Sequence, residues 1–144
     1  MHEQHDDVPK VALLLGWLGV LPFAAALAGI ALGDFTAHLA NAVLLIYGAV
    51  ILSFMGGVQW GLAMAAGSGP ARYVASVVPA LAGWAAVHLS SDGGKLLLAA
   101  AFLGLMLHDQ RTAAAGEAPA WYPRLRRPLT ITVVICLVLG SLIA

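Results

Sequence analysis

Long apolar runs separated by short polar segments are the feature that most constrains how this chain can fold. The first run covers residues 11–32, enough for the ~20 residues that a helix needs to cross the hydrocarbon core of a bilayer. Four further runs follow, at residues 39–66, 73–89, 95–108 and 129–144. The pattern predicts an all-α polytopic membrane helix bundle with five transmembrane helices, in a single domain of residues 11–144 after a polar tail of residues 1–10.

The composition supports a membrane protein. Hydrophobic residues make up 61% of the chain and charged residues 10%, whereas soluble domains have about 45–50% and about 25%. A soluble protein of 144 residues has too little interior to hide this much apolar surface. The formal net charge of zero gives no indication of a nucleic-acid partner, and a single cysteine, Cys136, excludes an intrachain disulfide.

The basic residues predict the orientation of the bundle. With five spans, the N-terminus and the second and fourth connecting segments share one side of the membrane. Six of the seven Lys and Arg residues fall on that side, namely Lys10, Arg72, Arg111, Arg124, Arg126 and Arg127. Cytoplasmic segments carry an excess of positive charge, so we expect the N-terminus inside and the C-terminus outside. Lys95 is on the outer side, where we expect it to snorkel towards the interface.

Small residues recur along the second apolar run. Ala49, Ser53, Gly57, Gly61 and Ala65 are spaced four apart, so they lie on one face of a helix. A face of small residues lets a second helix backbone approach closely within a membrane. The pattern predicts a helix-packing surface of Ser53, Gly56, Gly57 and Gly61. Prolines and glycines also predict irregular helices, with a kink at Pro22 and a tilt or a break at Gly56–Gly57.

Three residues are candidate functional groups within or beside the apolar runs. Gln59 and Trp60 lie next to the small-residue face. An amide in lipid needs a hydrogen-bond partner, so Gln59 either binds another helix or contacts a lipophilic ligand such as a quinone. Asp109 follows the fourth run, and we expect it to pair with Arg124 or Arg126.

Residues 116–127 are predicted to form the longest connecting loop, with a cluster of aromatic and basic residues. These are Trp121, Tyr122, Arg124, Arg126 and Arg127. Such a cluster either anchors the chain at an interface rich in anionic lipid or docks a partner protein. On the outer side, His38, His88, Asp34 and Asp92 are residue types that bind metals or relay protons, but they are ordinary in polar loops. We expect no metal and no cofactor.

Two sequence blocks, ILSFMGGVQWG at residues 51–61 and PAWYPRLR at residues 119–126, are the most specific motifs. Together with LGWLG at residues 15–19 and VPAL at residues 78–81, they resemble the DUF3429 family. This family includes bacterial inner-membrane proteins and a mitochondrial relative. The resemblance extends over residues 10–144, and it implies a five-helix, multi-pass protein of the bacterial inner (cytoplasmic) membrane. It implies no reaction and no catalytic residue.

The sequence favours two kinds of function. No charged residue lies in the middle of a predicted span, although proton pumps and ion-coupled carriers normally need one. Phosphate-binding loops, zinc-protease motifs and cysteine pairs are also missing, so an enzyme is the weakest class. We expect an accessory or assembly partner that packs against membrane lipids, other membrane subunits or its own copies. The alternative is a small carrier or a protein that binds a lipophilic ligand, either a lipid or a quinone.

Overall fold

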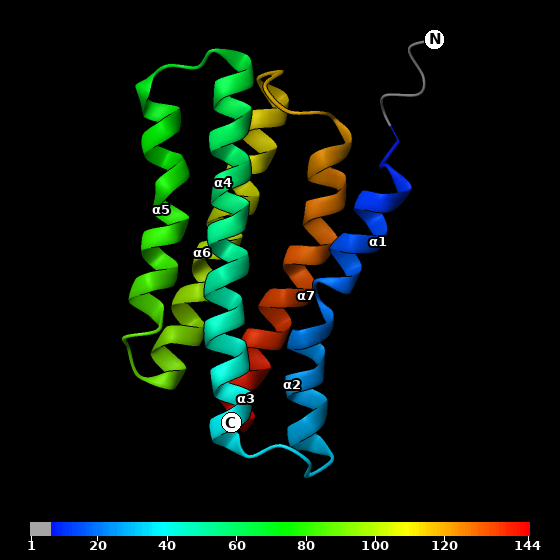
Figure 1. The fold of residues 1–144 in the computed structure, drawn as a ribbon, viewed down its shortest axis with the longest axis vertical. Helices are drawn as coiled ribbons and strands as arrows, with labels where there is room; N and C mark the ends of the chain where they lie inside the picture. Colours follow the sequence, from blue (N-terminus) through cyan, green and yellow to red (C-terminus); the bar gives the residue numbers. More distant parts are fainter. Residues whose placement is uncertain (1–6) are drawn as a thin grey trace.

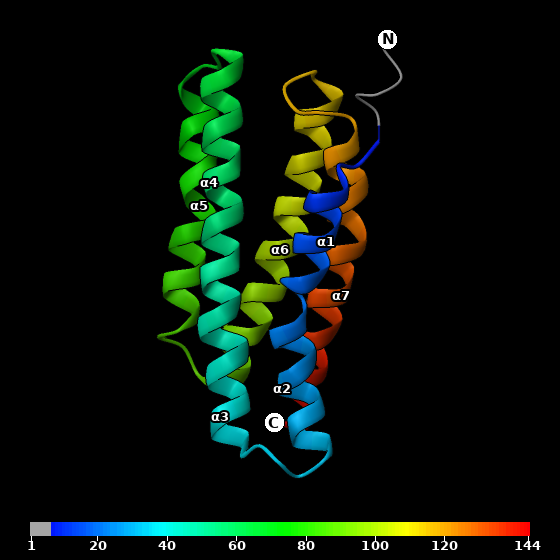
Figure 2. The same ribbon diagram turned by 45° about the vertical axis from the view of Figure 1, so that its right-hand side comes forward.

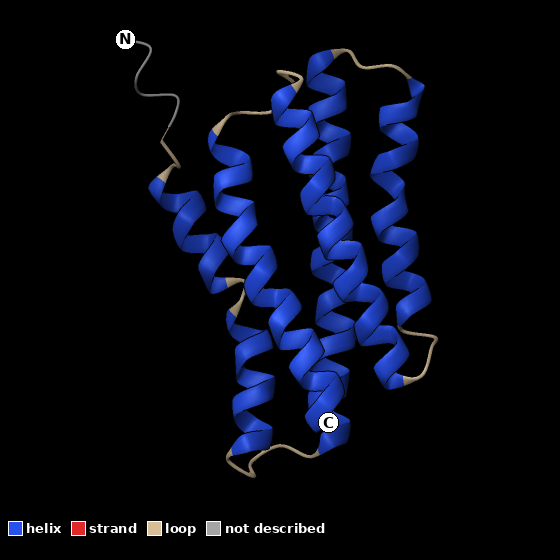
Figure 3. Ribbon diagram, turned by 180° about the vertical axis from the view of Figure 1, so that it is seen from behind, coloured by secondary structure: helices blue, strands red, loops and turns tan. Residues whose placement is uncertain are grey.

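The computed structural model describes residues 7–144, and this part of the chain is helical with no strand (Figure 3). Residues 1–6 of the predicted polar tail lie outside the described residues. The elements are α1 (Lys10–Leu18), α2 (Leu21–Ala31), α3 (Ala37–Ala42), the π-helix η2 (Val43–Tyr47), α4 (Gly48–Ala66), α5 (Pro70–Ala86), α6 (Ser91–Ala114) and α7 (Trp121–Ile143). The predicted all-α fold is confirmed.

The helices run up and down along one long axis (Figure 1). α4 packs closely against α5, and α6 packs closely against α7. In the rotated view of Figure 2, the pair of α4 and α5 stands beside a second group made of α6, α7, α1 and α2. The start of α1 and the C-terminus lie at opposite ends of the bundle (Figure 1).

Three helical segments of the described chain are long and apolar enough to cross a membrane: Lys10–Ala31, Ala37–Ala66 and Trp121–Ile143. α5 has only 17 residues, and α6 carries Asp92, Lys95, Asp109 and Arg111. The structure therefore shows a helical protein with several segments suited to a membrane.

The breaks in the helices differ from the predicted ones. Pro22 is the second residue of α2, where a helix does not need the missing N–H, so the first run forms two helices instead of one kinked helix. Tyr47 stabilises this junction by donating its hydroxyl to the Gly19 carbonyl at 2.8 Å. The break expected at Gly56–Gly57 is wrong, because α4 continues through both residues and the irregular turn of this path is η2 instead.

The predicted loop of residues 116–127 is also partly wrong, because α7 begins at Trp121. Pro123 is the third residue of α7, and the first N–H groups of a helix have no partner within it. A proline there costs no hydrogen bond. The candidate loop residues from Trp121 to Arg127 therefore lie on a helix, which fixes the direction of each side chain.

The glycines of α4 have different roles. A Cβ on Gly56 would lie 2.7 Å from the Ser76 carbonyl oxygen of α5, so the predicted close helix packing occurs at this residue. Ser53 is half-buried and donates to a carbonyl of its own helix. At Gly57 and Gly61, a Cβ would meet nothing within 4 Å in the described chain, so packing there against another helix of this chain is wrong. The buried face of α4, which includes Leu52, Gly56, Gln59 and Ala63, is rotated away from them.

Candidate functional site

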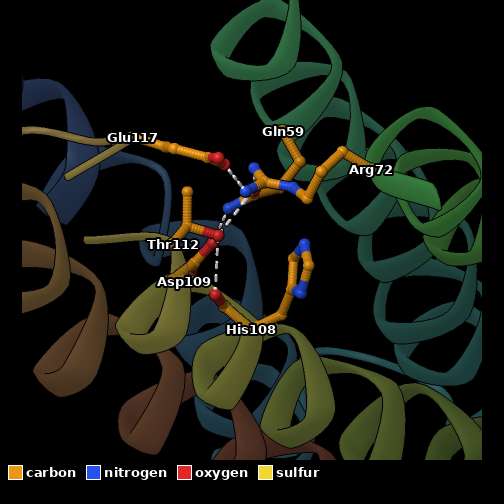
Figure 4. A network of polar contacts seen from close by, with 6 residues as sticks. All are labelled: Gln59, Arg72, His108, Asp109, Thr112 and Glu117. Atoms are coloured by element: carbon orange, nitrogen blue, oxygen red, sulfur yellow. Dashed lines mark hydrogen bonds and ion pairs between the residues drawn. The ribbon is translucent and has the colours of Figure 1, made fainter. Parts of the chain in front are cut away.

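A buried polar network joins α4, α5 and α6 near the end of the bundle where α4 leads into α5 (Figure 4), and Arg126 of α7 also belongs to it. Gln59 is completely buried, and its Nε2 donates to Oδ1 of Asp109 at 2.5 Å. Arg126 donates its Nε to the other oxygen of this carboxylate at 3.2 Å. Asp109 therefore connects α4 with α7 although it is itself on α6.

The second half of the network surrounds the carbonyl oxygen of the Gln59 side chain. Arg72 donates its Nη2 to Gln59 Oε1 at 3.1 Å, and its Nη1 forms an ion pair with Glu117. Thr112 Oγ1 lies 3.3 Å from the same Gln59 oxygen and donates to the His108 carbonyl at 2.8 Å. Gln59 thus has partners on both atoms of its amide.

The charges of this network cancel. Arg126 faces Asp109, and Arg72 faces Glu117, so two cations oppose two anions. The side chains of Asp109 and Arg126 are only 1% and 6% exposed. A charge buried to this degree is tolerated when it is paired and hydrogen-bonded, and each member of this pair meets that condition through the other.

The structure separates the predicted functional residues into two groups. Gln59 and Asp109 lie in contact, and Arg126 is the one of the two expected arginines that pairs with Asp109. Trp60 is exposed and packs edge-on against Tyr73 with ring centroids 5.0 Å apart, outside the network.

The aromatic and basic cluster at the start of α7 also divides. Tyr122 and Arg126 are buried, whereas Arg124 and Arg127 are exposed. Trp121 is half-buried and packs against the apolar core. The helix places the first two towards the bundle and the two arginines on its surface.

The sequence analysis did not identify Arg72, Thr112 and Glu117 as network members. One signal was available, because Arg72 is the only base of the second connecting segment and Glu117 the only acid in residues 116–127. Both segments were predicted on the same side of the membrane, so an ion pair between them was a reasonable hypothesis.

Lys95 does not snorkel, contrary to the prediction. Its side chain is completely buried and donates to Asn41 Oδ1 at 2.6 Å and to the Gly140 carbonyl at 2.9 Å. Asp92 Oδ1 lies 3.2 Å from the same ammonium group. Carbonyls near the C-terminal end of a helix attract a cation, and this interaction holds Lys95 against α7. On the same side, the described residues contain no group of three or more His, Cys, Asp or Glu able to hold a metal.

A cavity of about 310 Å³ lies between α1, α2, α4 and α7, beside the polar network. Its wall is mostly apolar and includes the rings of Phe23, Phe54 and Phe102. Three residues of α7 add polar groups: Tyr122, Arg126 and Thr130. Ligand pockets in proteins combine such an apolar lining with a few polar groups and have volumes of about 300–1,000 Å³.

Two of the residues that line the cavity each carry a buried polar atom with no hydrogen-bond partner among the described residues. These atoms are Nη2 of Arg126 and Oγ1 of Thr130, on residues that are 5% and 1% exposed. Hydroxyls inside helices usually bond to the carbonyl about four residues earlier, as Thr132 does with Pro128 at 2.8 Å. Thr130 does not make this bond, so its buried hydroxyl has no partner in the described chain.

These observations define a multi-pass helical membrane protein with a buried polar network and an adjoining cavity. Residues 8–142 match the family described as "Protein of unknown function (DUF3429)". The chain belongs to the DUF3429 family, as its motifs indicated.

Two curated relatives are named transmembrane protein 69. The Xenopus tropicalis protein is 40% identical over 144 residues, which cover 95% of this chain and 55% of the relative. The Mus musculus protein is 29% identical over 138 residues, covering 92% and 56%. This chain thus spans about half the length of these relatives. No solved structure matches it.

Proposed function

We propose that this protein crosses the bacterial inner membrane five times and binds a lipophilic molecule in the cavity between α1, α2, α4 and α7. The observation that supports this function is a pair of buried donors without partners, Arg126 Nη2 and Thr130 Oγ1, on two residues that line an otherwise apolar wall. A buried donor without a partner costs about 1–3 kcal/mol. A ligand that supplies acceptors recovers this free energy.

The cavity has a side that lipid can reach. Leu15 of α1 and Phe54 of α4 both line it and are 60% and 63% exposed. In a bilayer these side chains face the hydrocarbon, so a ligand with an apolar tail enters sideways from the membrane. Its polar head then lies beside α7, and its tail extends between Leu15 and Phe54 into the lipid.

The proposed topology has the N-terminus inside and the C-terminus outside. It is supported by the six basic residues that share one predicted side and by the buried, paired state of Lys95 and Asp109, which lowers the cost of placing α6 in a membrane. The bacterial inner membrane is supported by the resemblance of the motifs to bacterial members of the family.

Cysteine labelling in intact cells tests the topology. Leu89 and Ala115 are exposed positions that flank the two ends of α6. A membrane-impermeant maleimide is expected to label Leu89→Cys in intact cells and Ala115→Cys only after permeabilisation. The reverse pattern would contradict the orientation.

Mass spectrometry of the protein purified in mild detergent tests the cavity. The wild-type protein is expected to carry a lipid-like molecule in a fixed molar ratio. Val133 lines the cavity, so Val133→Phe should reduce the bound amount. Ile135 on the same helix is 53% exposed, and Ile135→Phe serves as the matched control. Equal amounts in all three proteins, or none, would refute a ligand in this cavity.

An accessory role is the second candidate function. The exposed Arg124 and Arg127 and the open face at Gly57 and Gly61 support a surface for other membrane subunits. Co-purification of such subunits in a stoichiometric amount, reduced by Arg124→Glu, is the expected result. A lone monomer with no partner in mild detergent would exclude this role.

A further inference from the structure

We propose that the ligand of the cavity is a neutral molecule whose head is a flat ring with carbonyl oxygens, the chemistry of membrane quinones. This inference rests on the proposed function of the cavity as a binding site for a lipophilic molecule. It adds the chemical class of the head, which follows from the donors, the charge and the shape of the site.

The available groups favour a hydrogen-bond acceptor. Arg126 can only donate, and its Nη2 has no partner in the described chain. The Thr130 hydroxyl is one turn further along the same helix and is also without a partner. The hydroxyl of Tyr122 makes a weak sulfur contact, 3.9 Å from Met55 Sδ, and lies next to the Arg126 guanidinium. A carbonyl oxygen has two lone pairs, so it can accept from these neighbouring donors.

The charge of the site favours a neutral head over an anion. Arg126 is already paired with Asp109 through Nε. A fatty acid or a phosphate at Nη2 would therefore bring a second negative charge to a guanidinium that one carboxylate has neutralised. Burying an extra unpaired charge is strongly unfavourable, whereas a carbonyl adds hydrogen bonds without adding charge.

The walls favour a flat ring. Phe23, Phe54, Phe102 and Tyr122 contribute aromatic rings, and Met55 contributes a polarisable thioether. An engineered cavity of ~150 Å³ in another protein holds benzene, so about 310 Å³ has room for a ring with several substituents. Diacylglycerol also offers neutral carbonyls, but its two chains diverge from the head and match these ring faces less well.

Gln59, for which a direct ligand contact was one predicted role, is not the contact that this proposal uses. Both atoms of its amide already have partners, and it does not line the cavity. The residue that presents a donor to the ligand is Arg126, which is held by the same carboxylate as Gln59.

The test uses the full chain in detergent and a benzoquinone with a ten-carbon tail as the probe. Quinones quench tryptophan fluorescence, and Trp17 and Trp121 each adjoin a residue that lines the cavity. The wild-type protein is expected to bind the probe saturably. Thr130→Val, which keeps the shape of the side chain, should weaken binding about tenfold through the loss of one hydrogen bond. Thr132→Val is the matched control and should bind like the wild type, because Thr132 bonds within its own helix.

Competition distinguishes the head groups. Dodecanoate and dioctanoylglycerol should each bind at least tenfold more weakly than the quinone probe, as measured by the concentration of each that reverses the quenching. If dodecanoate or dioctanoylglycerol binds more tightly than the quinone, and Val133→Phe weakens that binding, the quinone-like head is overturned. The proposed function of the cavity as a lipophilic site would remain. Equal binding of the probe to Thr130→Val and wild type would also overturn it. Binding of none of the three compounds would remove both this inference and the proposed function.

Discussion

Replacing Asp109 by leucine should destabilise the protein more than any other single change in the polar network. Asp109 is 1% exposed and is the only anion paired with Arg126 in the described chain. Asp109→Leu leaves a buried guanidinium without a counter-ion, which typically costs about 3–5 kcal/mol. Gln59 Nε2 also loses its acceptor, and an unpaired buried donor costs about 1–3 kcal/mol.

A double-mutant cycle separates the loss of pairing from the loss of packing. Removing both members of a buried ion pair in favour of apolar side chains is often nearly neutral. The double variant Asp109→Leu with Arg126→Met should therefore be more stable than Asp109→Leu alone by ~2–4 kcal/mol. Asp109→Asn, which keeps an acceptor but not the charge, should lie between the wild type and Asp109→Leu.

The assay is reversible unfolding in mixed micelles of mild detergent and dodecyl sulfate, followed by circular dichroism. A free energy of unfolding for Asp109→Leu within ~1 kcal/mol of the wild type would show that the pair is solvated in the membrane, and so would refute the burial on which the reasoning rests. A double variant less stable than Asp109→Leu would show that packing, and not the unpaired charge, dominates.

Two further predictions concern helix packing and the opposite end of the bundle, and both use the same unfolding assay. Gly56→Ala should lower the free energy of unfolding by ~1–3 kcal/mol, because its Cβ would lie 2.7 Å from a backbone oxygen of α5. Gly57→Ala has open space around the new Cβ and should change the free energy of unfolding little. Equal effects of the two substitutions would contradict the orientation of α4. Lys95→Met should cost ~1–3 kcal/mol because it removes the donor shared by Asn41 Oδ1 and the Gly140 carbonyl; an unchanged stability would mean that water satisfies both acceptors.

Proline accounts for the clearest differences between the predicted and the observed helices. A proline inside an apolar run predicts a kink, and a proline in a polar stretch predicts a loop. Both Pro22 and Pro123 instead occupy the first turn of a helix, where proline is well tolerated. The helical state of the apolar runs was predicted correctly, because a long apolar stretch in a membrane has few alternatives to a helix.

The polar site was predicted in part, for a reason visible in α4. Gln59 and Asp109 are recognisable from sequence because polar residues in or beside an apolar run need partners. Their pairing depends on how the helices rotate about their axes, and a stripe of small residues did not determine this rotation, since Gly56 packs and Gly57 does not. Thr130 gave no signal, because a threonine in an apolar helix usually bonds to its own backbone.

The network and the cavity share Arg126, whose guanidinium is oriented by the buried carboxylate of Asp109 and whose side chain lines the cavity. Asp109 uses one oxygen for Gln59 and the other for Nε of Arg126. Gln59 is itself held by Arg72 through its carbonyl oxygen, so the carboxylate has little freedom to move towards Nη2. The guanidinium is therefore anchored on one edge, while its Nη2 has no hydrogen-bond partner in the described chain. Under the proposed function, Gln59 and Asp109 are positioning residues and Arg126 and Thr130 are the ligand contacts, so polar residues that do not line the cavity would still be part of the site.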